Sequence, residues 1–166
     1  ATPDAAGWQN YWESVLAFWV SLGFTGFRCL HATSMPLEFL RNCIRRALCT
    51  AREPVMFAAD ALGEPPEALC ALRESGIHLV YNSSCWWQFD APWAVAQHAF
   101  MQQFSPSISF PENHDTPRLS ARSRSLLGVQ KQRYVFASFF SAALQVTMGY
   151  EFCWQKACHS TRTTVR

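Results

Sequence analysis

Residues 54–81, PVMFAADALGEPPEALCALRESGIHLVY, decide the fold class of this chain. They begin with an apolar segment, Pro54 to Ala59, continue with a helical pattern from Pro66 to Ser75 that stops at Gly76, and end with the apolar segment Ile77 to Tyr81. Continuously apolar segments are typical of strands buried on both faces, and a helix between two of them indicates a right-handed crossover and a parallel sheet. We therefore expect a strand, a helix and a second strand here.

The same alternation of helix and strand extends along the chain in both directions. On the N-terminal side, the pattern predicts a helix from Trp8 to Leu22, a strand from Phe24 to Cys29 and a helix that starts at Pro36. On the C-terminal side, it predicts a helix from Pro92 to Phe104, a strand from Ile108 to Phe110, a helix from Lys131 to Leu144 and a strand around Val146 to Tyr150. Since no linker or low-complexity segment divides the chain, we expect a single α/β domain or one piece of a domain.

Composition and charge lower the expectation of two classes of partner. The chain has 166 residues, with 14 Lys plus Arg against 12 Asp plus Glu, and its net charge of +2 is scattered. Such a balance predicts no nucleic-acid partner and no anionic membrane surface. The longest apolar stretch, Tyr134 to Val146, contains polar residues and is shorter than the roughly 20 residues of a membrane span.

The N-terminus shows no initiating Met and no basic, then apolar, leader before Trp8. We interpret it as a cut end rather than a signal peptide. The sequence leaves the cellular location open, with only a slight preference for the cytoplasm.

The seven cysteines form an odd set without regular spacing, and most lie inside apolar stretches. We therefore expect buried free thiols. The only cluster that resembles a set of metal ligands is Cys153, Cys158 and His159, and no CxxC pair accompanies it. We expect no metal and no cofactor.

Polar side chains follow the predicted strands, at the edge where ligands gather in parallel α/β folds. Arg28 and His31 come after the first strand, Asp60 after the second and Asn82 after the third. Asn113, His114 and Asp115 come after the fourth. Taken singly, such residues are often turn formers or helix caps, so a structural role for each is an open alternative. Their joint placement favours a site.

Three motifs in this order resemble a known family. They are Gly26-Phe27-Arg28, the segment Phe57 to Gly63 around Asp60, and Phe110-Pro111-Glu112-Asn113-His114-Asp115-Thr116-Pro117-Arg118. They resemble the second, third and fourth signature regions of the α-amylase family, glycoside hydrolase family 13. Met148-Gly149-Tyr150-Glu151-Phe152 resembles the family's eighth barrel strand, and Pro36-Leu37-Glu38-Phe39 resembles bacterial proteins near the maltosyltransferase branch.

The resemblance implies that residues 1–166 form a single partial catalytic domain. It would be the C-terminal part of a (β/α)8 TIM barrel, covering roughly strands four to eight, because a complete barrel takes about 250 residues. The N-terminal part of the barrel would be absent. The implied activity is that of an α-glucan-active hydrolase or transglycosylase with a retaining mechanism, acting on an α-glucan or malto-oligosaccharide.

Two of the implied catalytic positions are altered. Retaining glycosidases use two carboxyl groups, one as nucleophile and one as acid/base. Leu30 stands at the nucleophile position and has no lone pair with which to attack, so we expect the chain to be inactive by that route. His31 lies one residue further, where a strand would aim it at the opposite face. Asp60 stands where the family has a Glu, and it is shorter by one methylene.

The remaining implied site residues are intact. Asp115 corresponds to the acid that stabilises the transition state, and Arg28, Asn113 and His114 correspond to substrate-binding positions. Because Arg28 has lost the carboxylate that it holds in the family, we expect it to turn toward Asp115 or Asp60. Trp86 and Trp87 lie near the strand ends and could stack on a sugar, although core packing is the alternative in a chain with 14% aromatic residues.

Two further expectations concern the chain as a whole. The alternative to an enzyme domain is a non-catalytic relative that binds carbohydrate or serves as a scaffold. Open strand edges at both ends of a partial barrel would leave backbone groups unpaired, so we also expect self-association.

Overall fold

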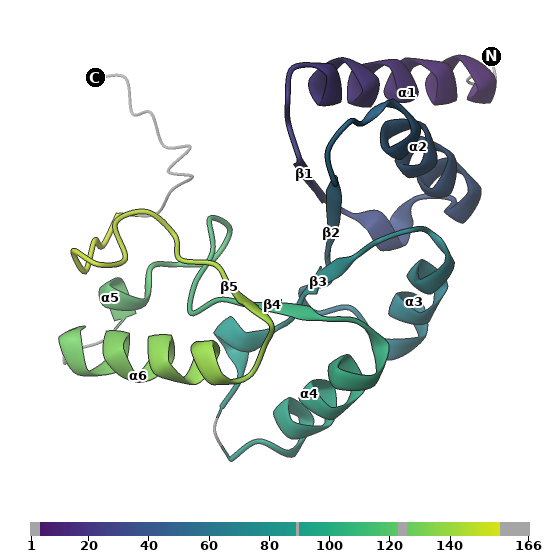
Figure 1. Ribbon diagram of the computed structural model, residues 1–166. Helices are drawn as coiled ribbons and strands as arrows, with labels where there is room; N and C mark the ends of the chain where they lie inside the picture. The colour runs from purple at the N-terminus through teal and green to yellow at the C-terminus, as the bar shows by residue number, and fades with distance from the viewer. Residues whose placement is uncertain (1–3, 89, 123–125, 157–166) are drawn as a thin grey trace. The chain divides into compact units, whose positions relative to one another are not determined.

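The computed structural model describes residues 4–88, 90–122 and 126–156 (Figure 1). The chain divides into two compact units. Unit 1 comprises Ala1–Tyr81 and Ala99–Pro106, and unit 2 comprises Asn82–His98 and Ser107–Arg166. Among the described residues, no helix has the length and apolar character needed to cross a membrane.

Unit 1 contains three parallel strands, β1 (Gly26–Cys29), β2 (Met56–Asp60) and β3 (Leu79–Tyr81), in the order β1-β2-β3. Its helices are α1 (Ala5–Ser21), α2 (Leu37–Thr50) and α3 (Pro66–Ala71), with short 3-10 helices at Ala32–Ser34 and Leu72–Glu74. The last turn of α4 (Pro92–Phe104) also belongs to unit 1. This arrangement confirms the strand, helix and strand predicted from residues 54–81.

One face of the unit 1 sheet forms the core, and the other carries polar side chains. Phe57, Ala59 and Val80 are at most 1% exposed and pack in one cluster with Leu40 and Ile44 of α2. Alternate residues of β2 are less buried and end with Asp60. Because side chains alternate between the two faces of a strand, Asp60 points away from the helical layer.

Unit 2 contains the parallel strands β4 (Ser107–Ser109) and β5 (Ala143–Leu144), with Ile108 paired to Ala143. Its helices are the first part of α4, α5 (Leu119–Arg122), α6 (Leu126–Phe139) and a 3-10 helix at Ser84–Trp86. Trp87, which is 1% exposed, forms edge contacts with the rings of Phe136 and Phe140 and donates its indole N–H to Gln97 at 2.8 Å. This indole is the centre of the unit 2 core.

Two predicted elements near the C-terminus are wrong. The helix expected from Lys131 to Leu144 ends at Phe139, where Ser141 accepts the backbone N–H of Ser109 at 3.1 Å and donates to Ala143. The strand expected around Val146 to Tyr150 instead lies at Ala143–Leu144.

Turns occupy residues 148–153, which resembled an eighth strand. Gly149 adopts a φ of +86°, and a Cβ there would lie 2.3 Å from the ring of Trp154. The backbone at Gly149 therefore cannot adopt a strand conformation, and the position accommodates only glycine.

The six described cysteines are free, as expected, but only Cys43 is buried. Cys49 and Cys70 are exposed, so the expectation that most thiols are buried is wrong. Cys158 and His159 of the possible ligand cluster lie outside the described residues. Within the described ranges, no three His, Cys, Asp or Glu side chains come together as a metal site.

Thiol reactivity tests this distribution. Burial is the main factor that raises the pKa of Cys29 to about 11, reinforced by Cys43. Burial likewise raises the pKa of Cys43 to about 11, reinforced by Glu13 and opposed by a hydrogen bond from Gln9. A pKa of 11 leaves about 300-fold less thiolate at neutral pH than an ordinary cysteine has. We expect iodoacetamide at pH 7.5 to alkylate Cys49 and Cys70 first, as measured by timed peptide mass spectrometry; equal rates at all four would contradict this burial pattern.

Candidate functional site

The pairing register of unit 1 places three polar side chains on one face of the sheet. Arg28 pairs with Ala58, and Asp60 follows Ala58 by two residues, so both point to the same side. Asp60 pairs in turn with Tyr81 on β3. The carboxyl ends of β1, β2 and β3 therefore bring Arg28, Asp60 and Tyr81 together, as predicted for Arg28 and Asp60.

Arg28 forms an ion pair with Asp60. Its Nη2 lies 2.5 Å from Asp60 Oδ2, and the side chains are 23% and 16% exposed. The guanidinium carbon also lies 4.3 Å from the centre of the Tyr81 ring, a cation–π contact. This geometry confirms that Arg28 turns toward an acidic side chain, and the acid is Asp60.

The surroundings of Tyr81 show the electrostatics of this face. Burial is the largest factor that raises the pKa of the phenol above its ordinary value. The positive charge of Arg28 lowers that pKa, and the negative charge of Asp60 raises it. Tyr81 is therefore a neutral hydrogen-bonding group that covers one side of the ion pair.

Leu30 stands just beyond β1 in a turn, and 47% of it is exposed. The next residue, His31, is also exposed and adopts a left-handed conformation with a φ of 53°. Neither side chain supplies the carboxylate that a glycosidase nucleophile requires. On this edge of unit 1, the acid available to Arg28 is Asp60.

In unit 2, Asn113 builds the loop that follows β4. It is 1% exposed, and its Oδ1 accepts the backbone N–H groups of Asp115 at 3.1 Å and Thr116 at 2.8 Å. This is the turn-forming role that the sequence left open as an alternative. Because Asn113 is buried, its surroundings favour this structural role over the expected contact with a substrate.

His114 and Asp115 are the accessible pair of this loop. His114 Nε2 lies 3.3 Å from Asp115 Oδ2, and the two side chains are 30% and 61% exposed. A carboxylate and an imidazole held together at a surface can accept and donate hydrogen bonds to vicinal hydroxyls. The predicted closeness of these two residues is present in the structure.

The sequence reasoning missed the ion pair between Glu112 and Arg118, in which Glu112 Oε1 lies 2.7 Å from Arg118 Nη1. Both side chains are almost fully buried, at 2% and 1% exposed. Burial raises the pKa of Glu112, while the Leu119 N–H and the charge of Arg118 oppose that rise. The signal in the sequence that could have predicted this pair is the presence of Glu112 and Arg118 near the two ends of the motif Phe110 to Arg118.

The other candidates separate into buried and accessible side chains. Asn82 is fully buried and donates to the hydroxyls of Ser107 and Ser109, so its role is structural. Trp86 is 48% exposed and free to contact a ligand. Trp87 is a core residue, which is the core-packing alternative that the sequence left open for it.

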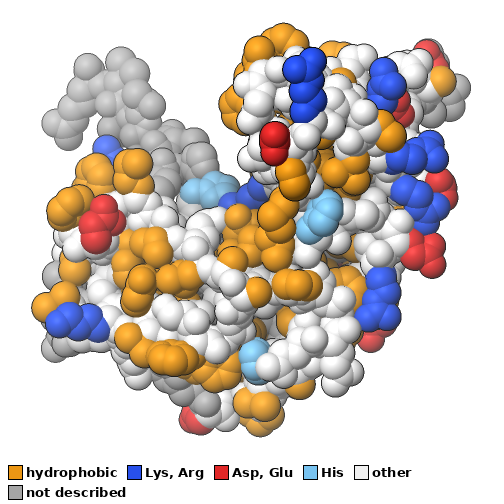
Figure 2. All heavy atoms as spheres, in the orientation of Figure 1, with side chains coloured by type: hydrophobic (Ala, Val, Ile, Leu, Met, Phe, Trp, Pro, Cys, Tyr) orange, Lys and Arg blue, Asp and Glu red, His pale blue; other side chains and the backbone are white. Residues whose placement is uncertain are grey.

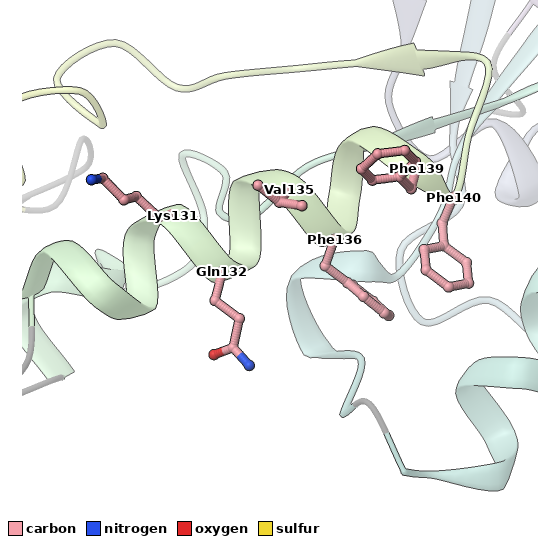
Figure 3. Close-up of a pocket in the computed structure, with 6 residues that line it drawn as sticks. All are labelled: Lys131, Gln132, Val135, Phe136, Phe139 and Phe140. Atoms are coloured by element: carbon pink, nitrogen blue, oxygen red, sulfur yellow. The ribbon is translucent and has the colours of Figure 1, made fainter.

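A hollow of about 580 Å³ lies along α6 and contains none of the predicted site residues (Figure 3). Its lining is almost entirely apolar and comes from one helix and the residue after it: Lys131, Gln132, Val135, Phe136, Phe139 and Phe140. With no converging polar groups, this surface lacks what a specific small-molecule site requires.

Removing the charge of Asp60 tests the unit 1 ion pair. Asp60→Asn keeps the shape but leaves Arg28 without a charged partner, so we expect the free energy of unfolding to fall by about 1 kcal/mol. Urea denaturation measures the change, and Glu38→Gln, which removes an exposed ion pair with Arg41, is the matched control with a change near zero. A loss in Asp60→Asn that persists in an Arg28→Met background would show that the two charges do not interact.

Comparison with known proteins gives one curated relative, and no protein-family model matches the chain. The relative is the alpha-1,4-glucan:maltose-1-phosphate maltosyltransferase of Burkholderia pseudomallei (strain K96243), which is 26% identical over 147 residues. The match covers 86% of this chain but only 13% of the relative. The chain therefore spans a small part of that enzyme.

Solved structures of similar fold are glycoside hydrolases. The α-amylase of Geobacillus thermoleovorans complexed with acarbose has a TM-score of 0.72 at 13% identity, covering 95% of this chain and 39% of that one. The trehalose-6-phosphate hydrolase of Bacillus licheniformis has a TM-score of 0.68 at 12% identity, covering 92% of this chain and 36% of that one. The maltogenic α-amylase of Thermotoga neapolitana has a TM-score of 0.64 at 16% identity, covering 90% and 36%.

These neighbours confirm the predicted fold, a partial barrel of parallel strands and helices. The curated relative adds a sequence match to an enzyme of the family that the motifs indicated. The curated relative and the solved structures support the resemblance to the α-amylase family, glycoside hydrolase family 13, and the fold corresponds to the C-terminal part of that family's catalytic barrel.

Proposed function

We propose that this chain binds an α-glucan or malto-oligosaccharide as part of an α-amylase-type barrel, and that it does not perform the retaining displacement. The observation that carries the proposal is the ion pair of Arg28 with Asp60, at 2.5 Å, beside an exposed Leu30. The guanidinium that would hold a nucleophile carboxylate is occupied by the residue at the acid/base position.

The chemistry of a retaining glycosidase explains why this arrangement is inactive. The mechanism needs one carboxylate that attacks the anomeric carbon and one carboxylic acid that protonates the leaving oxygen. Leu30 cannot form the covalent intermediate. Arg28 engages one oxygen of the Asp60 carboxylate, Oδ2, and the side chain is one methylene shorter than the Glu at the family's acid/base position, which places its carboxyl group further from a leaving oxygen.

Sugar binding needs less than catalysis does. The His114 and Asp115 pair is accessible and offers both a donor and acceptors to sugar hydroxyls. Trp86 presents a half-exposed flat ring on which a sugar face could stack. The name of the curated relative includes α-1,4-glucan, and two neighbours were solved with acarbose or with maltose. The alternative, a scaffold without a ligand, predicts no binding.

Calorimetric melting with maltoheptaose tests the proposal. A ligand that binds the native state at ten times its Kd adds about 1.4 kcal/mol, or about 3 °C in Tm for a chain of this size. We expect this shift in the wild type and its loss in Asp115→Asn and Trp86→Ala.

Phe139→Ala is the matched control, since Phe139 is an 82% exposed aromatic residue of α6 and lines the hollow that contains none of the predicted site residues. It is expected to keep the full shift. An unshifted wild-type Tm at millimolar sugar would refute sugar binding and favour the scaffold. Release of reducing sugar from maltoheptaose would refute the proposed inactivity.

We also propose that the chain self-associates through α1. The helix packs on α2 through one side, which includes the buried Val20. A second side of α1 carries exposed apolar side chains. Hydrophobic side chains are visible in orange at this end of unit 1 (Figure 2). The exposed side chains are Trp8, Tyr11, Trp12, Phe18, Trp19 and Leu22, at 41–58% exposure.

A second copy of the chain is the occupant that this surface favours. The exposed side chains of α1 carry almost no charge and recur at helical spacing along its whole length, so two such faces can pack against each other. Contiguous apolar surface of this kind is uncommon on monomers. In the strand order β1 is terminal, so unit 1 also carries a strand edge with unpaired backbone groups.

Sedimentation velocity over a range of concentrations tests self-association. We expect a dimer that Trp12→Glu/Trp19→Glu converts to monomer, because two buried charges would oppose the packing of the faces. Val95→Glu, which adds one charge at a 63% exposed position on α4, is the control and leaves the dimer intact. A wild type that sediments as a monomer at all concentrations would rule out the second copy.

A further inference from the structure

We infer that Glu112 and Arg118 are positioning residues whose buried ion pair fixes the loop that presents His114 and Asp115. The identity of the ligand in this inference rests on the proposed function. The geometry rests on the contacts within unit 2. Neither side chain reaches a ligand itself, because both are almost fully buried.

The side chain of Glu112 closes the loop from its first residue to its last. Its Oε1 lies 2.7 Å from Arg118 Nη1, and its Oε2 accepts the backbone N–H of Leu119 at 2.6 Å. Leu119 begins α5, so one carboxylate binds the loop end and the first turn of the helix together. The ends of the segment from Glu112 to Leu119 are therefore fixed relative to each other.

A second, smaller ring lies inside the first. Asn113 Oδ1 accepts the N–H groups of Asp115 and Thr116, and the Thr116 hydroxyl accepts the N–H of Asn113 at 3.1 Å. The backbone around His114 and Asp115 is thus determined at both of its ends. Such nested closure fixes the backbone from which the two accessible side chains are presented to a ligand.

Arg118 also connects this loop to the segment after β5. Its Nη2 donates to the carbonyl of Met148 at 2.5 Å, and Thr147 Oγ1 donates to the carbonyl of Glu112 at 2.9 Å. A Cβ at Gly149 would lie 2.7 Å from Arg118 Nη2, so the glycine makes room for the guanidinium. The guanidinium of Arg118 therefore connects the loop after β4 with the segment after β5.

The geometry requires arginine in particular. One Nη forms the ion pair with the Glu112 carboxylate and the other donates to the Met148 carbonyl, a two-partner arrangement that a planar guanidinium provides. A lysine ammonium keeps the charge but is a single point donor on a flexible stem. Removing either charge of the pair leaves the other buried without compensation, whereas replacing both by apolar residues of similar size can preserve folding.

The decisive variant is therefore Glu112→Met/Arg118→Met. It removes the ring closure while sparing the fold an unpaired buried charge. We expect the amide hydrogen exchange of Asp115 and Thr116 to accelerate at least tenfold, and the Kd for maltoheptaose to rise at least tenfold. Exchange in α6 of unit 2 reports whether the stability of that unit as a whole has changed, and we expect it to stay constant.

Two further variants keep the result interpretable. Glu38→Gln removes the exposed ion pair with Arg41 and is expected to change neither the loop amides nor the Kd. Arg118→Lys keeps the charge and is expected to accelerate the same two amides, even if the double methionine variant fails to fold. A loop with wild-type exchange in both Arg118 variants would overturn the positioning role.

The ligand measurement separates failure of the inference from failure of the proposed function. Unchanged maltoheptaose affinity in a folded variant whose loop amides exchange rapidly would show that loop order does not serve binding, and would overturn the role. Absence of binding by the wild type would refute the sugar ligand, and the exchange rates alone would then decide whether the pair orders the loop.

Discussion

The parallel register of β1, β2 and β3 is the constraint on which the arrangement of unit 1 depends. It sends Phe57 and Ala59 into the helical core, and it directs Arg28 and Asp60 to the opposite face. A shift of one residue would exchange these two faces, burying a guanidinium and a carboxylate among apolar side chains. The hydrophobic pattern that stabilises the sheet therefore also determines where the polar groups meet.

The two units use charge in different ways. In unit 1, the pair of Arg28 and Asp60 remains partly exposed, and Asp60 supplies the carboxylate that neutralises the guanidinium. In unit 2, Glu112 and Arg118 are withdrawn from water, and His114 and Asp115 are presented to it. In our proposal, the buried pair holds the loop of unit 2 in shape, and the accessible pair contacts the sugar. The altered residue after β1, Leu30, does not change the residues of the loop that presents His114 and Asp115.

Apolar segments predicted the fold because they report burial directly. The strand from Pro54 to Ala59 and the helix from Pro92 to Phe104 both follow from local pattern and from proline punctuation. The helix expected up to Leu144 was too long because the apolar residues continue past Phe139 without a glycine or proline, and the stop depends on the tertiary contact of Ser141 with Ser109. No local pattern contains that contact.

The site could be predicted only as far as local sequence determines it. Strand ends located Arg28, Asp60, His114 and Asp115, but the different fates of Trp86 and Trp87 depend on the turn of one short helix. The pairing of Glu112 with Arg118 requires the loop to fold back on itself, which spacing alone does not reveal.

The burial of Trp87 determines what intrinsic tryptophan fluorescence can report about this molecule. Of the seven tryptophans, six are 41–56% exposed, and Trp87 alone is 1% exposed. A half-exposed indole changes its emission less on unfolding than a buried one. In the monomer, the largest change in intrinsic fluorescence during melting will therefore come from one side chain in unit 2, whereas in the proposed dimer the indoles of α1 would also report the separation of the two copies.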